Sequence, residues 1–281
     1  PSRLCRRCTP GSASIARRLG TASTRHPAAR ADATPVGPHA GGADSSISTG
    51  EDLRVVSWNI HKALDSGLAA ELARLVEERA PHVLALQEAR PGLPLPAGFA
   101  GHHAASFRRG LMGPEEGVMT LARAPALAAH RVRSSERELR LLTPKAALIS
   151  QLPLSDGREL CLVNVHGLNF DPTGRQLARQ LDDLRERVAH ISGPVVVAGD
   201  FNTWNDRRMG AVRDLAHALD LEEVAPDFPG GTKGRLPGRK ARETLGLDHR
   251  LHLDRLFVRG LVPVHAAWMD SYRCSDHVPL I

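Results

Sequence analysis

The stretch Val195-Val-Val-Ala-Gly-Asp-Phe-Asn202 joins an uninterrupted apolar run to polar residues. The run follows Ser192-Gly193-Pro194 and is short, which is typical of a strand buried on both faces of a sheet. Asp200 and Asn202 come directly after it, at the end where a packed sheet gives way to a polar rim. We therefore expect a buried strand that ends in candidate functional side chains.

Strand patterns and helix patterns alternate from residue 51 onward, with no internal repeat. Strands are expected at 53–58, 82–87, 117–122, 146–152, 160–166, 195–198, 254–258 and 263–268. Helices are expected at 67–79, 172–190 and 207–219, and loops at 91–101 and 226–250. In the first helix Leu68, Leu72 and Leu75 recur on one face. The alternation predicts an α/β domain over residues 51–281.

The first fifty residues differ in composition from the rest. They hold seven arginines and two acidic residues, so +5 of the chain's formal charge of +6 lies there, and every Trp, Tyr and Phe lies after residue 50. A segment this poor in large apolar residues cannot offset its ordering entropy, so we expect residues 1–50 to be a disordered leader. Its Arg-rich, acid-poor composition resembles an organellar transit peptide, and a non-native extension is the alternative.

Composition argues against several classes of protein. The 281 residues are 42% hydrophobic and 24% charged, which is typical of a soluble globular protein. No apolar run approaches the ~18 residues that a membrane span needs, and four cysteines are too few for a disulfide-stapled scaffold. The folded part is nearly neutral, so charge does not favour a nucleic-acid substrate. We expect a cytoplasmic monomer without a stable protein partner, with organellar targeting left open.

Polar side chains recur at the ends of the predicted strands. Any one of them alone would be interpreted as a turn residue or a helix cap. The set comprises Asn59, Glu88, His166, Asp200, Asn202, Asp254, Asp276 and His277. Carboxylate oxygens suit Mg²⁺ or Mn²⁺ rather than zinc, and Mg²⁺ takes only one or two protein carboxylates. Phosphoester hydrolysis needs such charge neutralisation, an activated water and an assisted leaving group.

Six short motifs resemble, in identity and order, those of the endonuclease/exonuclease/phosphatase superfamily. They are Ser57-Trp-Asn-Ile-His61, Leu86-Gln-Glu88, Val163-Asn-Val-His166, Gly199-Asp-Phe-Asn202, Leu253-Asp-Arg-Leu-Phe-Val258 and Ser275-Asp-His277. The superfamily includes deoxyribonucleases, apurinic-site endonucleases, inositol-polyphosphate phosphatases and neutral sphingomyelinases, and the resemblance is closest to a bacterial branch of undefined substrate. It implies a four-layer sandwich in which two β-sheets pack face to face with helices outside.

The resemblance also implies a metal site and a carboxylate–imidazole pair. Glu88 would be the first ligand of Mg²⁺ or Mn²⁺, and Asp276 and Asn59 would complete or support that site. Asp254 and His277 would form the pair, in which the carboxylate fixes the ring tautomer and raises its basicity.

Three further residues receive roles from the same resemblance. Asp200 would orient or deprotonate the attacking water, or hold a second metal. Asn202 would hydrogen-bond the phosphoryl group, and His166 would stabilise the phosphate or protonate the leaving oxygen. Family members of the deoxyribonuclease type pair this histidine with a glutamate, for which Glu115 and Glu116 are the nearby candidates here.

The sequence thus predicts a divalent-metal-dependent phosphoesterase that hydrolyses a phosphodiester by water attack on phosphorus. The substrate stays undecided between nucleic acid and a phospholipid or smaller phosphodiester. The alternative is a catalytically inactive module that binds phosphate or nucleic acid. The presence of all eight polar residues argues against that alternative, since inactive relatives usually lose some of them.

Overall fold

Two mixed β-sheets form the centre of the molecule in a computed structural model that describes residues 33–36, 43–63, 65–108, 115–138, 144–226 and 252–281. One sheet has, in spatial order, β1 (Thr34–Val36), β4 (Ala100–Arg108), β5 (Glu115–Ala122), β3 (Val83–Ala89) and β2 (Val55–Asn59). The other has β10 (Glu222–Glu223), β11 (Asp254–Arg259), β9 (Val195–Asp200), β8 (Glu159–His166), β7 (Ala146–Pro153) and β6 (Ala128–Arg133). Within the described residues, no helix is long and apolar enough to cross a membrane.

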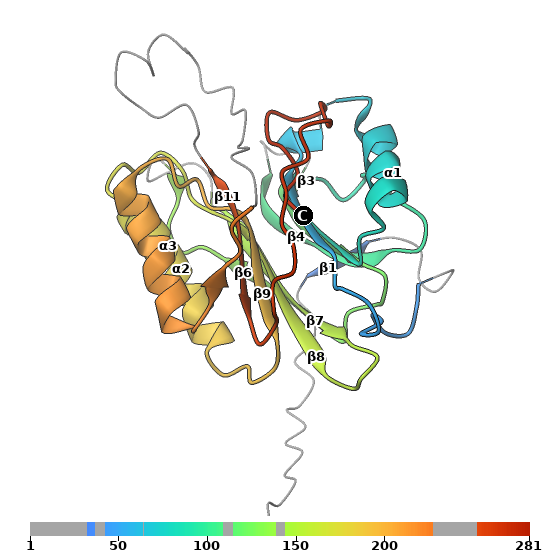
Figure 1. Cartoon of the computed structure of the whole chain (residues 1–281). Coiled ribbons are helices and arrows are strands. Elements are labelled where there is room, and N and C mark those ends of the chain that lie inside the picture. Colours follow the sequence, from blue (N-terminus) through green and yellow to red (C-terminus); the bar gives the residue numbers. More distant parts are fainter. Residues whose placement is uncertain (1–32, 37–42, 64, 109–114, 139–143, 227–251) are drawn as a thin grey trace, which may run out of the picture.

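Helices cover the outer faces of both sheets (Figure 1). The helix α1 (Leu68–Arg79) lies on the five-stranded sheet, and α2 (Arg175–Val188) and α3 (Asp206–Ala218) lie together on the six-stranded sheet. A single 3-10 turn, η1 (His61–Ala63), follows β2. The arrangement is the four-layer sandwich that the resemblance implies, and it agrees with the α/β domain that the strand–helix alternation predicts.

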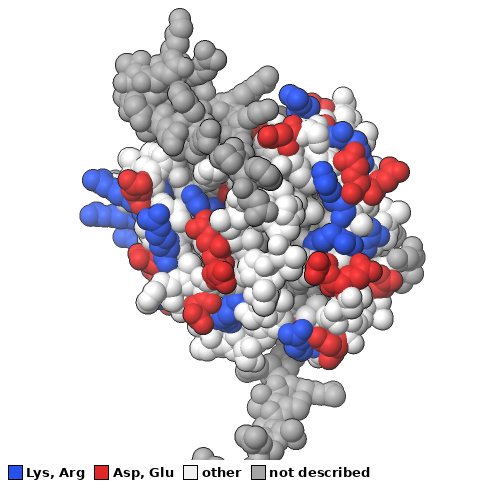
Figure 2. All heavy atoms as spheres, in the orientation of Figure 1, with Lys and Arg blue, Asp and Glu red and all other residues white. Residues whose placement is uncertain are grey.

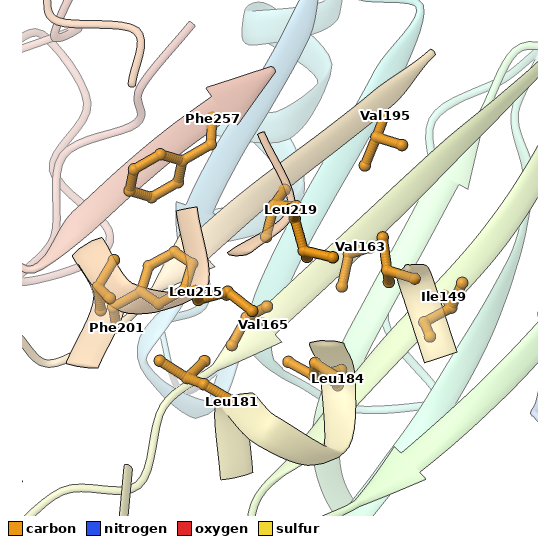
Figure 3. Packing of buried hydrophobic residues seen from close by; sticks show 14 of the residues in the cluster. Ile149, Val163, Val165, Leu181, Leu184, Val195, Phe201, Leu215, Leu219 and Phe257 are labelled. Atoms are coloured by element: carbon orange, nitrogen blue, oxygen red, sulfur yellow. The ribbon is translucent and has the colours of Figure 1, made fainter. Parts of the chain in front are cut away.

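Alternate residues of the central strands fill different layers of the core. On β8, Val163 and Val165 pack against the helices, whereas Leu160 and Leu162 pack against the opposite sheet. Figure 3 shows the helix-side cluster, in which Leu184 lies near the strand valines. Because both faces are buried, such strands carry the continuous apolar runs from which they were predicted.

The predicted helices and most predicted strands are confirmed, but several elements differ. Residues 263–268 form no strand; Trp268 makes only an isolated bridge to Leu280, and Val264 is 73% exposed. Within the described residues, this segment pairs only at its end, where Ala267 and Ile281 exchange two backbone hydrogen bonds, so the apolar alternation does not extend into a strand. Conversely, β4 and β6 are strands that the sequence did not predict, because their Ala, Gly and His residues have weak strand preference.

Two segments before residue 50 belong to the folded part, which differs from the expectation of a disordered leader. Thr34–Val36 pairs antiparallel with β4. Ile47 is 1% exposed, bridges to Leu154 and packs in the core between the sheets. A few apolar residues are enough to order these two segments, because one pairs with the edge of β4 and the other packs into the core between the sheets. Residues 1–32, and residues 227–250 of the expected loop, lie outside the described residues.

Gly199 lies in β9 directly before Asp200, where a side chain has no room. Its φ is +148°, and a Cβ would come within 1.9 Å of the carbonyl oxygen of Val165 on β8. We expect Gly199→Ala to lower the free energy of unfolding by about 3 kcal/mol or more, since strain and a backbone clash add. Urea unfolding would measure this. The matched control is Gly210→Ala on α3, where a Cβ meets open space; equal effects of the two variants would contradict the expectation.

Candidate active site

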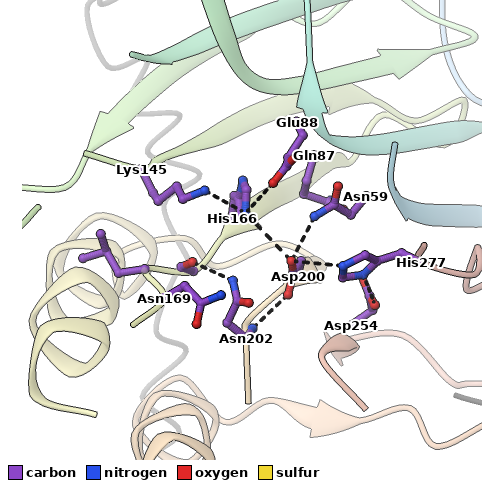
Figure 4. Close-up of polar contacts among 12 residues, drawn as sticks. Asn59, Gln87, Glu88, Lys145, His166, Asn169, Asp200, Asn202, Asp254 and His277 are labelled. Atoms are coloured by element: carbon purple, nitrogen blue, oxygen red, sulfur yellow. Dashed lines mark hydrogen bonds and ion pairs between the residues drawn. The ribbon is translucent and has the colours of Figure 1, made fainter. Parts of the chain in front are cut away.

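The predicted polar residues meet where strands of both sheets end. Strands β2 and β3 are parallel, as are β8 and β9, so each pair has its carboxyl ends at one edge. In the six-stranded sheet His166 and Asp254 stand in register with Asp200 on either side. Asn59 reaches the same carboxylate from the other sheet, as Figure 4 shows. The sheet register therefore makes Asp200 the centre of the site.

Asp200 is buried and held by two hydrogen bonds. The Asn59 side-chain amide donates to its Oδ2 at 3.0 Å, and the backbone N–H of Asn202 donates to its Oδ1 at 2.9 Å. Burial raises the pKa of Asp200, the positive charge of His277 opposes this, and the negative charge of Asp254 adds to it, with a net value of about 6. Such a carboxyl group is ionised near neutral pH but accepts a proton readily.

Asp254 and His277 are in contact, as the resemblance implies. Asp254 Oδ2 lies 2.8 Å from Nδ1 of His277, and Nε2 of the same ring lies 3.8 Å from Asp200 Oδ2. The indole N–H of Trp58 donates to the carbonyl of His277 and fixes its backbone. Burial alone would lower the pKa of His277, but the charges of Asp254 and Asp200 and the Asp254 hydrogen bond outweigh it, raising the pKa to about 10. His277 is therefore an imidazolium that directs a donor into the site.

His166 lies at the end of β8, on the other side of Asp200. Its Nε2 is 3.8 Å from Asp200 Oδ2, 3.8 Å from Glu88 Oε1 and 3.2 Å from the ammonium of Lys145. Burial, and then the charge of Lys145, lower the pKa of His166 well below its ordinary value. The ring is therefore neutral and can accept a hydrogen bond at Nε2.

Glu88 owes its position to a bulge in β3. The register shifts between Gln87 and Ala89, and Glu88 has a left-handed φ of +55°. A bulge re-aims a side chain, and a strained backbone of this kind recurs at functional sites. The glutamate beside His166 is thus Glu88. Glu116, which was a candidate for that position, pairs with Arg90 at 3.3 Å instead.

Two of the three predicted metal ligands, Asp276 and Asn59, make contacts with other residues of the site. Asp276 Oδ1 lies 3.7 Å from Nδ1 of His61, and Asn59 is occupied with Asp200. Across the described ranges, the only cluster of three metal-binding side chains within 4.8 Å of one another is Asp200, Asp254 and His277. Because Nδ1 of His277 is already hydrogen-bonded to Asp254, this cluster is suited to proton transfer.

Glu88 nevertheless fits a divalent cation. Its carboxylate is partly exposed, faces the centre of the site, and has one ion-pair contact with a described residue, at 3.8 Å. Its oxygens are hard ligands of the kind that Mg²⁺ and Mn²⁺ prefer, and neighbouring Asn59 and Asp200 also offer oxygen atoms. The ligand roles of Asp276 and Asn59 stay predictions.

Asn202 and the loops around it are held by a buried arginine that the sequence did not single out. The Asn202 side-chain amide donates to the carbonyl of Gly167 at 2.9 Å, which joins the loops after β8 and β9. Arg208 of α3 is fully buried and donates to the carbonyls of Asn202 at 2.5 Å, Asp171 at 3.0 Å and Leu168. No sequence signal distinguishes it from its exposed neighbour Arg207.

A cavity of about 610 Å³ lies away from this chemistry. Its lining includes Val55 at the start of β2, Val196 near the start of β9 and Val258 near the end of β11. These positions are at the opposite ends of the strands that carry Asn59 and Asp200. The arrangement of polar groups, and not this cavity, therefore locates the candidate active site.

The family model for the Endonuclease/Exonuclease/phosphatase family matches residues 56–277, which includes every predicted site residue. The chain belongs to this family. It is 36% identical over 259 residues to a UPF0294 protein of Klebsiella pneumoniae (strain 342), covering 91% of this chain and 89% of that protein. A UPF0294 protein of Yersinia pestis is 36% identical over 238 residues, covering 84% of each chain.

Solved structures of the family share the fold at lower identity. An endonuclease/exonuclease/phosphatase family protein from Leptotrichia buccalis superposes with a TM-score of 0.63 at 15% identity, covering 82% of this chain and 98% of that one. The catalytic domain of human Nocturnin has a TM-score of 0.59 at 19% identity, covering 81% and 92%. These structural likenesses show the shared sandwich fold.

Proposed function

We propose that this family member is a divalent-metal-dependent phosphodiesterase that hydrolyses its substrate by water attack on phosphorus. The observation that carries the proposal is the Asp254–His277 pair, whose ring Nε2 faces Asp200 3.8 Å away at the edge where Glu88 and His166 also end. Phosphoester hydrolysis requires an acid, a base and a carboxylate that can hold a cation, all within one small volume.

Asp200 and His277 have complementary proton roles. Asp200 Oδ2 is positioned to take a proton from the attacking water, because its raised pKa brings its basicity close to neutral pH. His277 Nε2–H can donate to a phosphoryl oxygen as negative charge develops there, and Asp254 holds that ring in place. Glu88 would hold Mg²⁺ or Mn²⁺, and such an ion would neutralise phosphoryl charge when bound.

The charge pattern on the face drawn in Figure 2 favours no particular polyanion. On the face drawn in Figure 2, Lys and Arg alternate with Asp and Glu instead of forming a field of one sign. The D. rerio TDP2, which shares the fold at 18% identity, has been solved with a single-strand DNA product. Single-stranded DNA is therefore one reasonable trial substrate beside lipid and small phosphodiesters.

A panel of substrates tests the proposal. Purified protein is incubated with bis(4-nitrophenyl) phosphate, single- and double-stranded DNA, an apurinic-site duplex, a sphingophospholipid and an inositol phosphate, with Mg²⁺, Mn²⁺ or EDTA. We expect metal-dependent hydrolysis of the simple diester and of one natural class. A nucleic-acid substrate would show a steep loss of binding as salt rises, and a small one would not. Phosphate binding without any turnover would instead indicate the inactive module.

Asp254→Asn should separate the orienting role of the carboxylate from metal binding. The amide keeps the shape but loses the charge that holds His277 protonated, so the pKa of His277 should fall. We expect kcat to drop about 100-fold, since positioned acid–base groups contribute ~10²–10⁴-fold. The high-pH limb of the rate profile should move to lower pH. Asp214→Asn on the exposed face of α3 is the control, and an unchanged profile in Asp254→Asn would exclude this role.

A further inference from the structure

Lys145 is a nearly buried cation that the sequence motifs do not include. It directly precedes β7 and has 11% of its side chain exposed. Its ammonium lies 3.2 Å from Nε2 of His166 and 3.7 Å from Oε1 of Glu138. The same Glu138 oxygen accepts the backbone N–H of Asn169 at 2.9 Å, so the acid is fixed to the loop after β8. The cation is thus held beside the candidate catalytic histidine.

The geometry leaves part of the hydrogen-bonding capacity of Lys145 for another group. An ammonium has three donors, and charge-assisted hydrogen bonds to carboxylates are about 2.7–2.9 Å long. At 3.7 Å, Glu138 balances the charge of Lys145 without forming a bond of that kind. Among the described residues, His166 is the one hydrogen-bond acceptor of Lys145. A buried ammonium arranged in this way is suited to bind a further acceptor.

The charges around the site indicate which acceptor it would be. The carboxylates of Glu88 and Asp200 would repel an entering anionic phosphoryl group. In Figure 4 the cations Lys145 and His277 flank these two carboxylates from opposite sides. His277 can donate a hydrogen bond to one oxygen of a phosphoryl group. A second fixed donor on the His166 side would then neutralise the negative charge on another oxygen of the same group.

We propose that Lys145 is a catalytic residue whose ammonium donates a hydrogen bond to a non-bridging phosphoryl oxygen of the substrate, next to His166. The proposal rests on the phosphodiesterase function proposed above and assigns one part of its substrate-binding site. Glu138 acts through Lys145 as a positioning residue. A purely structural Lys145–Glu138 ion pair would stabilise the fold but would not contact phosphate.

The test compares the wild type with Lys145→Met, Lys145→Arg and the charge-balanced double variant Glu138→Gln/Lys145→Met. The double variant avoids leaving Glu138 buried without its cation, so it keeps the test valid if the single Met variant fails to fold. Two readouts are used: hydrolysis of bis(4-nitrophenyl) phosphate with Mg²⁺, and calorimetric binding of inorganic phosphate. Arg187→Met, an exposed cation near the far end of α2, is the matched control.

We expect both Met variants to lose about 100-fold in kcat/KM, in the range for removing one donor to a developing oxyanion. Phosphate binding should weaken at least about tenfold, and Lys145→Arg should retain more of both properties. If the folded Met variants bind phosphate and turn over substrate as the wild type does, the proposal is wrong. If the wild type binds phosphate through Lys145 but never hydrolyses a diester, only the proposed function fails. If the wild type does not bind phosphate, the assignment of Lys145 fails too.

Discussion

Glu88→Gln is expected to lower the metal-dependent rate of phosphodiester hydrolysis about 1,000-fold. The amide has the same shape as the carboxylate but lacks the negative charge that a divalent cation needs. A metal ion contributes several kcal/mol of charge stabilisation, and each 1.4 kcal/mol corresponds to about a tenfold change in rate. The backbone should tolerate the change, since both side chains can occupy the bulge at φ +55°. Initial rates with Mg²⁺ and titration of Mn²⁺ binding would measure the two consequences separately.

Glu77→Gln provides the matched control, because Glu77 is an exposed residue of α1 away from the strand ends that form the site. It should change neither the rate nor Mn²⁺ affinity. A folded Glu88→Gln protein that binds Mn²⁺ as tightly as the wild type would show that the metal has other ligands. The group of Asp200, Asp254 and His277 would then be the next candidate.

Arg208→Leu is expected to lower the free energy of unfolding by about 3–5 kcal/mol, the range for disrupting a buried charged network. The substitution leaves three backbone carbonyls, those of Asn202, Leu168 and Asp171, without the donor that now reaches them. Urea unfolding in the presence of EDTA would measure the effect without a contribution from bound metal. We also expect reduced activity in the folded fraction, because Arg208 joins the loops that follow His166 and Asp200.

Arg207→Leu serves as the control for Arg208→Leu. The two arginines are adjacent in α3, yet one is exposed and the other fully buried. Arg207→Leu should change stability by no more than about 0.5 kcal/mol, as is usual for a surface position. Similar losses in the two variants would show that helix α3 itself, and not the carbonyl contacts, is sensitive to leucine.

The parts of the fold that could be predicted from sequence are those buried on both faces. In strand β9, Val195 and Val197 pack in the core on the helix side and Val196 packs in the core between the sheets, so all three positions are apolar. Burial on both faces of the strand appears in the sequence as a continuous apolar run, from which the strand can be predicted. Strand β4 could not be found in this way, because its small and polar residues are strand-forming only through their pairing with β1 and β5.

The site residues also fall into two groups: those that a local sequence pattern marks and those that only tertiary contacts reveal. Asp200 and Asp254 follow or open recognisable strands, so their meeting follows from sheet register. Lys145 contacts His166, 21 positions away, and Arg208 contacts Leu168, 40 positions away, so no local sequence pattern marks them. The sequence indicates Glu115 and Glu116 as candidate partners of His166, because the bulge that turns Glu88 toward the histidine cannot be inferred from composition.

The most direct test is the hydrolysis of bis(4-nitrophenyl) phosphate by the wild type and Glu88→Gln, each assayed with Mg²⁺ and with EDTA. It asks whether the sheet edge that bears Glu88 is a metal-dependent phosphodiesterase site; this edge also bears Asn59, His166, Asp200, Asp254 and His277. We predict turnover only for the wild type with Mg²⁺, restored when Mg²⁺ is added back after EDTA. Equal rates for the two proteins, or a wild-type rate unaffected by EDTA, would contradict it.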